Sequence, residues 1–202
     1  MSLEEGYRET KASSSLIWAG AIPICTGTAT TELGERVLVS AGHCLTEVKN
    51  LDRFYVERNS LTQRGVKVEL LREKYFGPER WKEGDFALFR LPQESKLRSV
   101  PVCKELPRTG EEVWSWAGPA GIEPVLLSGK FSGVANFPAN PRRPANGLLV
   151  VSFSVQKGAS GAGVFKMEGG KPCVWGVVAG RPEEIPGISY IYPIISDIKS
   201  LP

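Results

Sequence analysis

The sequence contains little histidine, aspartate and cysteine. Its 202 residues include a single histidine, His43, and only three aspartates, Asp52, Asp85 and Asp197. None of its four cysteines falls in a C-x-x-C pair, so we expect no zinc or other metal site. One histidine and three aspartates are therefore the candidates for a His–Asp pair.

Long apolar runs are absent as well. No stretch approaches the roughly 18 residues of a membrane span, and the N-terminus lacks the charged-then-apolar layout of a signal peptide. We therefore expect no membrane partner. Residues 1–14 are largely polar and are predicted to form a disordered N-terminal segment.

An excess of charge of one sign is also missing. The chain carries 25 Lys and Arg against 22 Asp and Glu, a formal charge of +3, which is too weak a bias to predict a nucleic-acid partner. The nearest basic cluster is Pro141-Arg142-Arg143-Pro144, which we interpret as an exposed loop. The composition, with 42% hydrophobic and 23% charged residues, is typical of a soluble globular protein. We expect no cofactor and a monomer.

Short runs rich in β-branched and aromatic residues recur along the chain, each bounded by turn-forming or polar residues. The chain has 22 Gly and 15 Pro, which leaves little room for long helices. The pattern indicates an all-β sandwich or a pair of barrels, with helical turns only at Cys44–Val48 and Ile195–Leu201. The predicted strands are Leu16–Ile22, Arg36–Val39, Val66–Leu71, Phe86–Leu91, Glu112–Trp116, Pro124–Leu127, Leu148–Phe153, Gly163–Lys166, Val174–Val178 and Ile188–Tyr192.

Three segments carry the groups that a serine nucleophile needs: a base, an anion that orients the base, and N–H donors for an oxyanion. An apolar strand ends in small residues and His43, a turn delivers Asp85 to the start of another apolar strand, and Ser160 lies in a run of glycine and alanine. Glycine at Gly158 and Gly161 lets the backbone bend so that the N–H groups of Gly158 and Ser160 can face one pocket. Each motif alone is more often structural, and their joint order favours catalysis.

These segments resemble the motifs of the chymotrypsin-like (trypsin-fold) serine proteases. Ser40-Ala41-Gly42-His43-Cys44 is similar to T-A-A-H-C, Gly84-Asp85-Phe86-Ala87-Leu88 to D-I-A-L, and Gly158-Ala159-Ser160-Gly161-Ala162 to G-D-S-G-G. The resemblance runs from about Leu16 to Ile198. His43 and Asp85 are 42 positions apart, and Asp85 and Ser160 are 75 positions apart. The second separation is short for the digestive enzymes and favours the short-loop bacterial and viral branch.

The resemblance implies a fold of two six-stranded antiparallel Greek-key barrels, with the active site in the cleft between them and a short C-terminal helix. Residues 15–95 would form the first barrel with His43 and Asp85, and residues 96–110 the crossover, within the polar stretch 92–110. Residues 111–202 would form the second barrel with Ser160, the oxyanion hole and the specificity pocket, followed by the helix.

The activity that the resemblance implies is that of a serine endopeptidase acting on a protein or peptide substrate. Ser160 would attack the scissile carbonyl, His43 would accept its proton, and Asp85 would orient the imidazole. The N–H groups of Gly158 and Ser160 would form the oxyanion hole.

Cysteine spacing alone leaves both disulfides and free thiols open. The segment Cys25-Thr26-Gly27-Thr28 resembles the strand whose cysteine is bridged to the one after the histidine, which implies a Cys25–Cys44 disulfide. Such a bond implies a secreted or extracytoplasmic location. Cys103 and Cys173 match no pair of the family. They could bond to each other, Cys103 could pair with an absent pro-segment, or both could be buried thiols.

The chain departs from the family at the residues that activate it. Ala159 occupies the position at which trypsin-like zymogens carry an aspartate that pairs with a new N-terminal amine, and the Ile-Val-Gly-Gly start exposed by cleavage is missing. Activation by that route is therefore not expected. Ala179 replaces a serine that in many relatives bonds the triad aspartate, so Asp85 is expected to rely on backbone donors or water.

The expected specificity pocket departs from the family as well. Ser154 occupies the base of the pocket, where trypsin has aspartate, so cleavage after Lys or Arg loses its usual support. Val178 stands where glutamate- and glutamine-cutting relatives have a histidine. Lys157 and Arg181 are interpreted as solvated rim charges, with attraction of an acidic side chain as the alternative. With Ala179 and Gly180 these residues would bind the substrate, and we expect a preference for small or apolar side chains.

Two other functions stay open at this point. The chain could be a polyprotein-processing protease of narrow specificity, which the short second barrel and the missing zymogen chemistry favour. It could also be a catalytically inactive protease-like binding module, against which the presence of His43, Asp85 and Ser160 together argues.

Overall fold

The computed structural model describes residues 1–46, 48, 53–58, 60–77, 80, 83–136, 147–182 and 185–199. The basic cluster Pro141-Arg142-Arg143-Pro144 lies outside these ranges, as do parts of the predicted helical turns Cys44–Val48 and Ile195–Leu201. Over the described ranges no helix has both the length and the apolar character that crossing a membrane requires.

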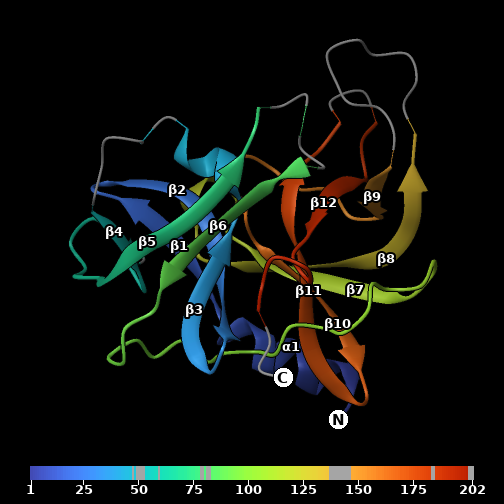
Figure 1. Cartoon of the computed structure of the whole chain (residues 1–202), viewed down its shortest axis with the longest axis horizontal. Helices are drawn as coiled ribbons and strands as arrows, with labels where there is room; N and C mark the ends of the chain where they lie inside the picture. The colour runs from blue at the N-terminus through green and yellow to red at the C-terminus, as the bar shows by residue number, and fades with distance from the viewer. Residues whose placement is uncertain are drawn as a thin grey trace.

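Within these residues, twelve strands form two closed antiparallel barrels, drawn at left and right in Figure 1. The first barrel has the strand order β1-β2-β3-β6-β5-β4 and the second the order β10-β11-β12-β9-β8-β7. The fold class predicted from the sequence is confirmed. The strands are β1 (Ser14–Ala19), β2 (Ile22–Glu32), β3 (Glu35–Ser40), β4 (Phe54–Val56), β5 (Val66–Tyr75), β6 (Asp85–Arg90), β7 (Glu112–Ala117), β8 (Val125–Ala135), β9 (Leu148–Val151), β10 (Gly163–Glu168), β11 (Lys171–Gly180) and β12 (Ser189–Pro193).

Apolar side chains fill each barrel and the contact between them. The interior of the first barrel includes Leu38 and Phe89, and in the second Phe131 packs edge-on against Trp175. A third cluster joins side chains from both barrels, such as Phe86 of β6 with residues of β7, β10 and β11. Because residue 86 directly follows Asp85, this shared cluster holds the start of β6 close to the second barrel.

The N-terminal segment differs from the disorder expected of it, because it forms helix α1 (Leu3–Lys11). The Ser2 hydroxyl accepts the N–H of Glu5, and the Glu5 carboxylate accepts the N–H of Ser2, which caps the first turn. The helix packs on the second barrel, where the indole N–H of Trp114 donates to the buried Thr10 hydroxyl at 2.8 Å. Local polarity could not reveal this helix, since it depends on partners far along the chain.

The C-terminal segment makes a single helical turn where the sequence predicted a short helix. The N–H of Ile198 donates to the carbonyl of Ile194 at 3.1 Å, and the described chain ends at residue 199. The turn is held on the first barrel by Glu32 of β2, whose carboxylate accepts Arg72 Nη1 and the N–H of Lys199, both at 3.0 Å. Burial alone would raise the pKa of Glu32, but the bonds from Arg72 and Lys199 lower it below its ordinary value.

Replacing Glu32 by glutamine is expected to lower the free energy of unfolding by about 1–2 kcal/mol at pH 7, because the charge-assisted bonds from Arg72 are lost. The lowered pKa means that ionised Glu32 stabilises the fold above its unfolded-state pKa, and that this contribution disappears as the pH falls through the folded-state pKa. The difference between wild type and Glu32→Gln, measured by urea denaturation, should therefore narrow from pH 7 to pH 3.

The control for this prediction is Glu69→Gln, which breaks an exposed pair with Arg90 at 2.7 Å. It should change the unfolding free energy by less than about 0.5 kcal/mol. A Glu32→Gln deficit that stays the same at both pH values would contradict the stabilising role assigned to the ionised carboxylate.

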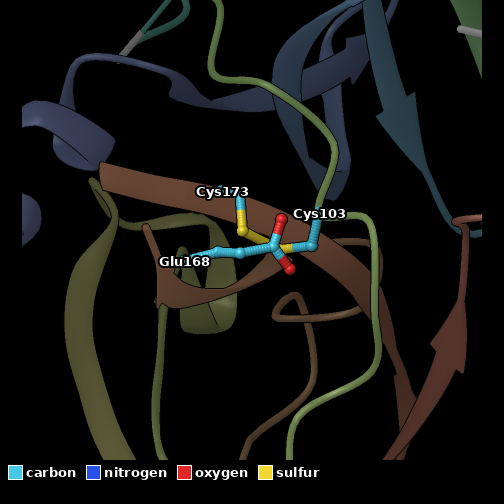
Figure 2. A group of neighbouring side chains, drawn as sticks. All are labelled: Cys103, Glu168 and Cys173. Carbon is cyan, nitrogen blue, oxygen red and sulfur yellow. A yellow bond between two sulfur atoms is a disulfide. The ribbon is translucent and has the colours of Figure 1, made fainter. Parts of the chain in front are cut away.

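The crossover between the barrels is fastened to β11 by a disulfide. Cys103 and Cys173 are bonded with their Cα atoms 5.0 Å apart, and the N–H of Cys103 donates to the carbonyl of Val174 at 2.9 Å. Figure 2 shows the Glu168 carboxylate beside this bond, where it accepts the N–H of Lys104 at 2.9 Å. Both sulfurs are consumed by the disulfide, so this cluster offers no thiolate ligand to a metal ion. The pairing of Cys103, left open by the sequence, is thereby decided.

Candidate active site

His43 is placed by the end of β3 and the 3-10 helix η1 (Gly42–Leu45) that follows. A Cβ atom at Gly42 would lie 2.8 Å from the carbonyl oxygen of Lys74 and 3.0 Å from that of Phe86, so only glycine fits there. The backbone of residue 42 therefore packs directly on β5 and β6. This close approach brings His43 to the start of β6.

Asp85 is the first residue of β6 and is fully buried. Its Oδ2 lies 2.8 Å from Nδ1 of His43, and its Oδ1 accepts the backbone N–H of His43 at 2.9 Å. When Nδ1 carries the proton toward this carboxylate, Nε2 keeps its lone pair and can accept a proton from another group. The second bond is the kind of backbone donor expected to support Asp85 in the absence of a hydroxyl at Ala179.

Ser160 lies in the loop between β9 and β10, which packs against the segment that leads to His43. Its carbonyl accepts the N–H of Thr26 at 3.0 Å. At Gly161, where φ is +80°, an added Cβ would lie 2.0 Å from Ser40 Oγ and 2.8 Å from the N atom of Ala41. The loop therefore touches the residues that directly precede Gly42 and His43.

A disulfide links β2 to the 3-10 helix η1 that contains His43. Cys25 precedes Thr26, Cys44 follows His43, and the two cysteines are bonded with Cα atoms 6.1 Å apart. The pairing that the resemblance implied is thus present. The strand that binds the Ser160 carbonyl is covalently tied to the residue beside the imidazole.

The Ser160 loop packs against the segment that leads to His43, but the Ser160 hydroxyl and the His43 ring are not hydrogen-bonded to each other in the described structure. Within the described part of the chain, no hydrogen bond links Ser160 Oγ to the imidazole. Bonds of this type are often long in enzymes without substrate and tighten when the substrate binds.

Two backbone N–H groups flank Ser160 with their orientations set by neighbouring bonds. The carbonyl of Lys157 accepts the N–H of Ala120 at 2.6 Å, and all peptide bonds described are trans, so the N–H of Gly158 points the opposite way. In the same manner the carbonyl of Ala159 accepts the N–H of Ala162 at 3.2 Å, so the N–H of Ser160 points away from Ala162. Neither N–H finds a protein acceptor among the described residues. Two such donors beside a hydroxyl can bind an oxyanion.

The residues expected to line a specificity pocket fall into two groups. Lys157 and Arg181 are exposed, as rim positions would be. Ser154 is exposed as well, whereas a residue at the base of a pocket would be enclosed. Val178 is fully buried in the interior of the second barrel, and its carbonyl accepts the N–H of Gly161 at 2.8 Å. Ala179 is buried in the cluster shared by the two barrels, and Gly180 ends β11 in a partly exposed position.

Sequence reasoning missed the residues that orient the N–H donors. Gly118-Pro119-Ala120-Gly121 reads only as a tight turn, although turn-forming residues at this density could have marked it for attention. Thr26 lies inside the segment Cys25-Thr26-Gly27-Thr28, in which the resemblance to the family depends on Cys25. No feature of a single sequence distinguishes this threonine from the other threonines of β2.

Comparisons with known proteins agree with this architecture. The chain matches two solved structures of Rv3671c from M. tuberculosis H37Rv, both in an inactive form. The first, a serine-to-alanine mutant, has a TM-score of 0.65 and 15% identity, and the match covers 92% of this chain and 83% of the other. The second, a structure of the protease, has a TM-score of 0.67 and 15% identity, and the match covers 96% of this chain and 90% of the other. It also matches a serine endoprotease from Yersinia pestis with TM-score 0.68, 15% identity and coverage of 98% and 64%. At this identity the likeness supports the fold alone. No curated protein sequence matches the chain.

The family comparison covers most of the sequence. The model of the trypsin-like peptidase domain matches residues 25–176, a range that includes His43, Asp85 and Ser160. The matched range also spans parts of both barrels and the whole crossover. This chain therefore belongs to the trypsin-like peptidase domain family.

Proposed function

We propose that the protein is a serine endopeptidase that cleaves peptide bonds through an acyl-enzyme intermediate, with His43, Asp85 and Ser160 as its catalytic residues. The observation that carries the proposal is the buried Asp85 carboxylate, 2.8 Å from Nδ1 of the only histidine. The Ser160 loop packs against the segment that leads to His43 and presents two N–H groups without a protein acceptor in the described structure. Base, orienting anion, nucleophile and oxyanion donors are thus all supplied by one small region.

The mechanism assigns each group one task. As Ser160 Oγ bonds to the carbonyl carbon, its proton moves to Nε2 of His43, and Asp85 stabilises the imidazolium that forms. The oxyanion accepts the N–H groups of Gly158 and Ser160. His43 then gives its proton to the leaving amine, which departs and leaves an ester on Ser160. Water, deprotonated by His43, hydrolyses the ester and restores the enzyme. Activity is expected to fall in acid, because a protonated imidazole cannot accept the serine proton.

Digestion of a peptide library, followed by mass spectrometry of the products, tests the proposal. Wild type should produce internal cuts that Ser160→Ala does not produce. With Ser154 rather than a carboxylate at the expected base of the pocket, the cuts should not be confined to sites after Lys or Arg. An absence of cleavage by wild type would favour the inactive binding module, and strict cleavage after basic residues would overturn the assignment of Ser154.

Removing the Cys25–Cys44 disulfide by substituting both cysteines with alanine is expected to cost about 3 kcal/mol of unfolding free energy. It should also lower kcat by about tenfold, since a misplacement of the adjacent His43 by even 1 Å is costly. Removing Cys103–Cys173 in the same way should cost about 4 kcal/mol, because that bond closes a longer loop. It should leave kcat unchanged, because neither cysteine is next to His43, Asp85 or Ser160 in the sequence. Chemical denaturation and steady-state kinetics measure both effects. Equal kcat in the two variants would contradict the link between Cys44 and the imidazole.

The two disulfides support a secreted or extracytoplasmic location for the protein. Alkylation of the native protein without reductant should modify none of its four cysteines. Quantitative modification of all four would overturn this location.

A further inference from the structure

Thr26 of β2 connects two segments of the second barrel through one buried hydroxyl. Its Oγ1 lies 3.0 Å from the N atom of Gly118 and 3.2 Å from the carbonyl oxygen of Gly158. A backbone N–H can only donate and a carbonyl can only accept, so the hydroxyl accepts from Gly118 and donates its single proton to Gly158. Because the residue is fully buried, water cannot readily replace either bond.

The Gly118 end of this connection controls the N–H of Gly158. Gly118 is followed by the 3-10 turn η3 (Pro119–Gly121), in which Ala120 has φ +52° in the left-handed region. Such a conformation costs a residue with a side chain on the order of 1 kcal/mol and persists only when its surroundings hold it. The N–H of Ala120 is the donor that holds the Lys157 carbonyl toward the turn, and the N–H of Gly158 in the same trans peptide therefore points away from it.

The turn and the loop meet backbone to backbone. A Cβ atom at Gly158 would lie 2.8 Å from the carbonyl oxygen of Gly118 and 2.9 Å from the N atom of Ala120. No side chain lies between them to absorb a shift. A displacement of η3 is therefore passed directly to the peptide that carries the Gly158 N–H.

The backbone of Thr26 makes two hydrogen bonds, as its side chain does. Its N–H donates to the Ser160 carbonyl at 3.0 Å, and its carbonyl accepts the Ser40 hydroxyl at 2.8 Å. Its neighbour Cys25 is bonded to Cys44, next to His43. Thr26 is thus connected to His43 through the neighbouring disulfide, to Ser160 through its backbone N–H, and to the turn at Gly118 through its hydroxyl.

We propose that Thr26 is a positioning residue that holds the oxyanion donors in register with His43, an inference that rests on the proposed function. The resemblance implies that relatives with an aspartate at the position of Ala159 use an ion pair in this loop. Ala159 is a fully buried alanine, so no charge can do so here. The Thr26 hydroxyl provides the constraint instead, through the Gly158 carbonyl on one side and through Gly118 and Ala120 on the other.

The kinetic test compares Thr26→Val, Thr26→Ser and Thr30→Val. Valine keeps the shape of threonine without the hydroxyl, so Thr26→Val should lower kcat by about 10- to 100-fold with KM nearly unchanged, somewhat less than the loss of an oxyanion donor itself. Thr26→Ser should restore kcat to within about threefold, since it keeps the bonds. Thr30 is the matched control: it is fully buried on the same strand, but its hydroxyl donates to Val100 at 2.6 Å in the crossover. Thr30→Val should lose comparable stability and keep kcat.

Amide hydrogen exchange followed by NMR provides a readout that does not need activity. The amides of Gly118 and Ala120 should exchange at least about tenfold faster in Thr26→Val than in wild type, and should be unchanged in Thr30→Val. If wild type cleaves no peptide, the proposed function fails on its own, and the exchange rates still decide whether Thr26 holds the loop. Faster exchange at both amides together with the loss of kcat supports the proposal. Unchanged exchange, or an unchanged kcat in an active enzyme, overturns it.

Discussion

Replacing Ser160 by alanine is expected to lower kcat by about 10⁶-fold, because the proposed nucleophile is removed. The fold should be preserved, since the hydroxyl makes no hydrogen bond in the described structure and the substitution should change stability by less than about 0.5 kcal/mol. Progress curves on a peptide identified in the library digestion measure the first quantity, and chemical denaturation measures the second.

The control for this variant is Ser152→Ala in the same stretch of chain. The Ser152 hydroxyl accepts the N–H of Lys130 at 2.8 Å, so its loss affects only stability and should leave kcat within about twofold. A double variant, Ser160→Ala with His43→Ala, should be no slower than Ser160→Ala alone, because groups that act as one unit are not additive. Retention of more than about 1% of the activity in Ser160→Ala would contradict its role as nucleophile.

Replacing Asp85 by asparagine is expected to lower kcat by about 10⁴-fold while KM changes little. The amide oxygen can keep the bond from the His43 backbone N–H, which leaves the amide NH2 facing Nδ1. An NH2 group forces Nδ1 to accept, and the ring proton then sits on Nε2, the atom that must take the serine proton. The variant would thus have nearly native geometry and the wrong tautomer.

The matched control is Asp197→Asn. Asp197 is also an aspartate that accepts one close side-chain bond, from the Tyr192 hydroxyl at 2.7 Å, but it lies in the C-terminal turn. Steady-state kinetics should show an unchanged kcat for Asp197→Asn and the large loss for Asp85→Asn. A loss of less than about tenfold in Asp85→Asn would contradict the orienting role of the carboxylate.

The strands that sequence patterns predicted are those with local, repeated apolar residues. The missed strands show the limit of that signal. β4 (Phe54–Val56) is too short for any periodicity, and β2 (Ile22–Glu32) combines threonines with Gly27. A Cβ at Gly27 would lie 2.8 Å from Leu38 Cδ2, so the glycine that weakens the pattern is required by packing across the barrel.

Some residues of the candidate site could be predicted from local sequence, and others could not. His43, Asp85 and Ser160 could be proposed from sequence because each stands in a short segment of distinctive composition. The roles of Thr26 and Ala120 could not, because both depend on backbone atoms of residues distant in sequence. A hydroxyl that bonds Gly158 across 132 positions leaves no local trace.

The most direct test of the central claim is labelling with a fluorophosphonate, which reacts with a serine hydroxyl only when a base and an oxyanion site activate it. Peptide mapping by mass spectrometry should place a single adduct on Ser160 in the wild-type protein, and neither Ser160→Ala nor His43→Ala should be labelled. An unlabelled wild type, or an adduct of equal yield in His43→Ala, would show that these three segments do not form one catalytic unit.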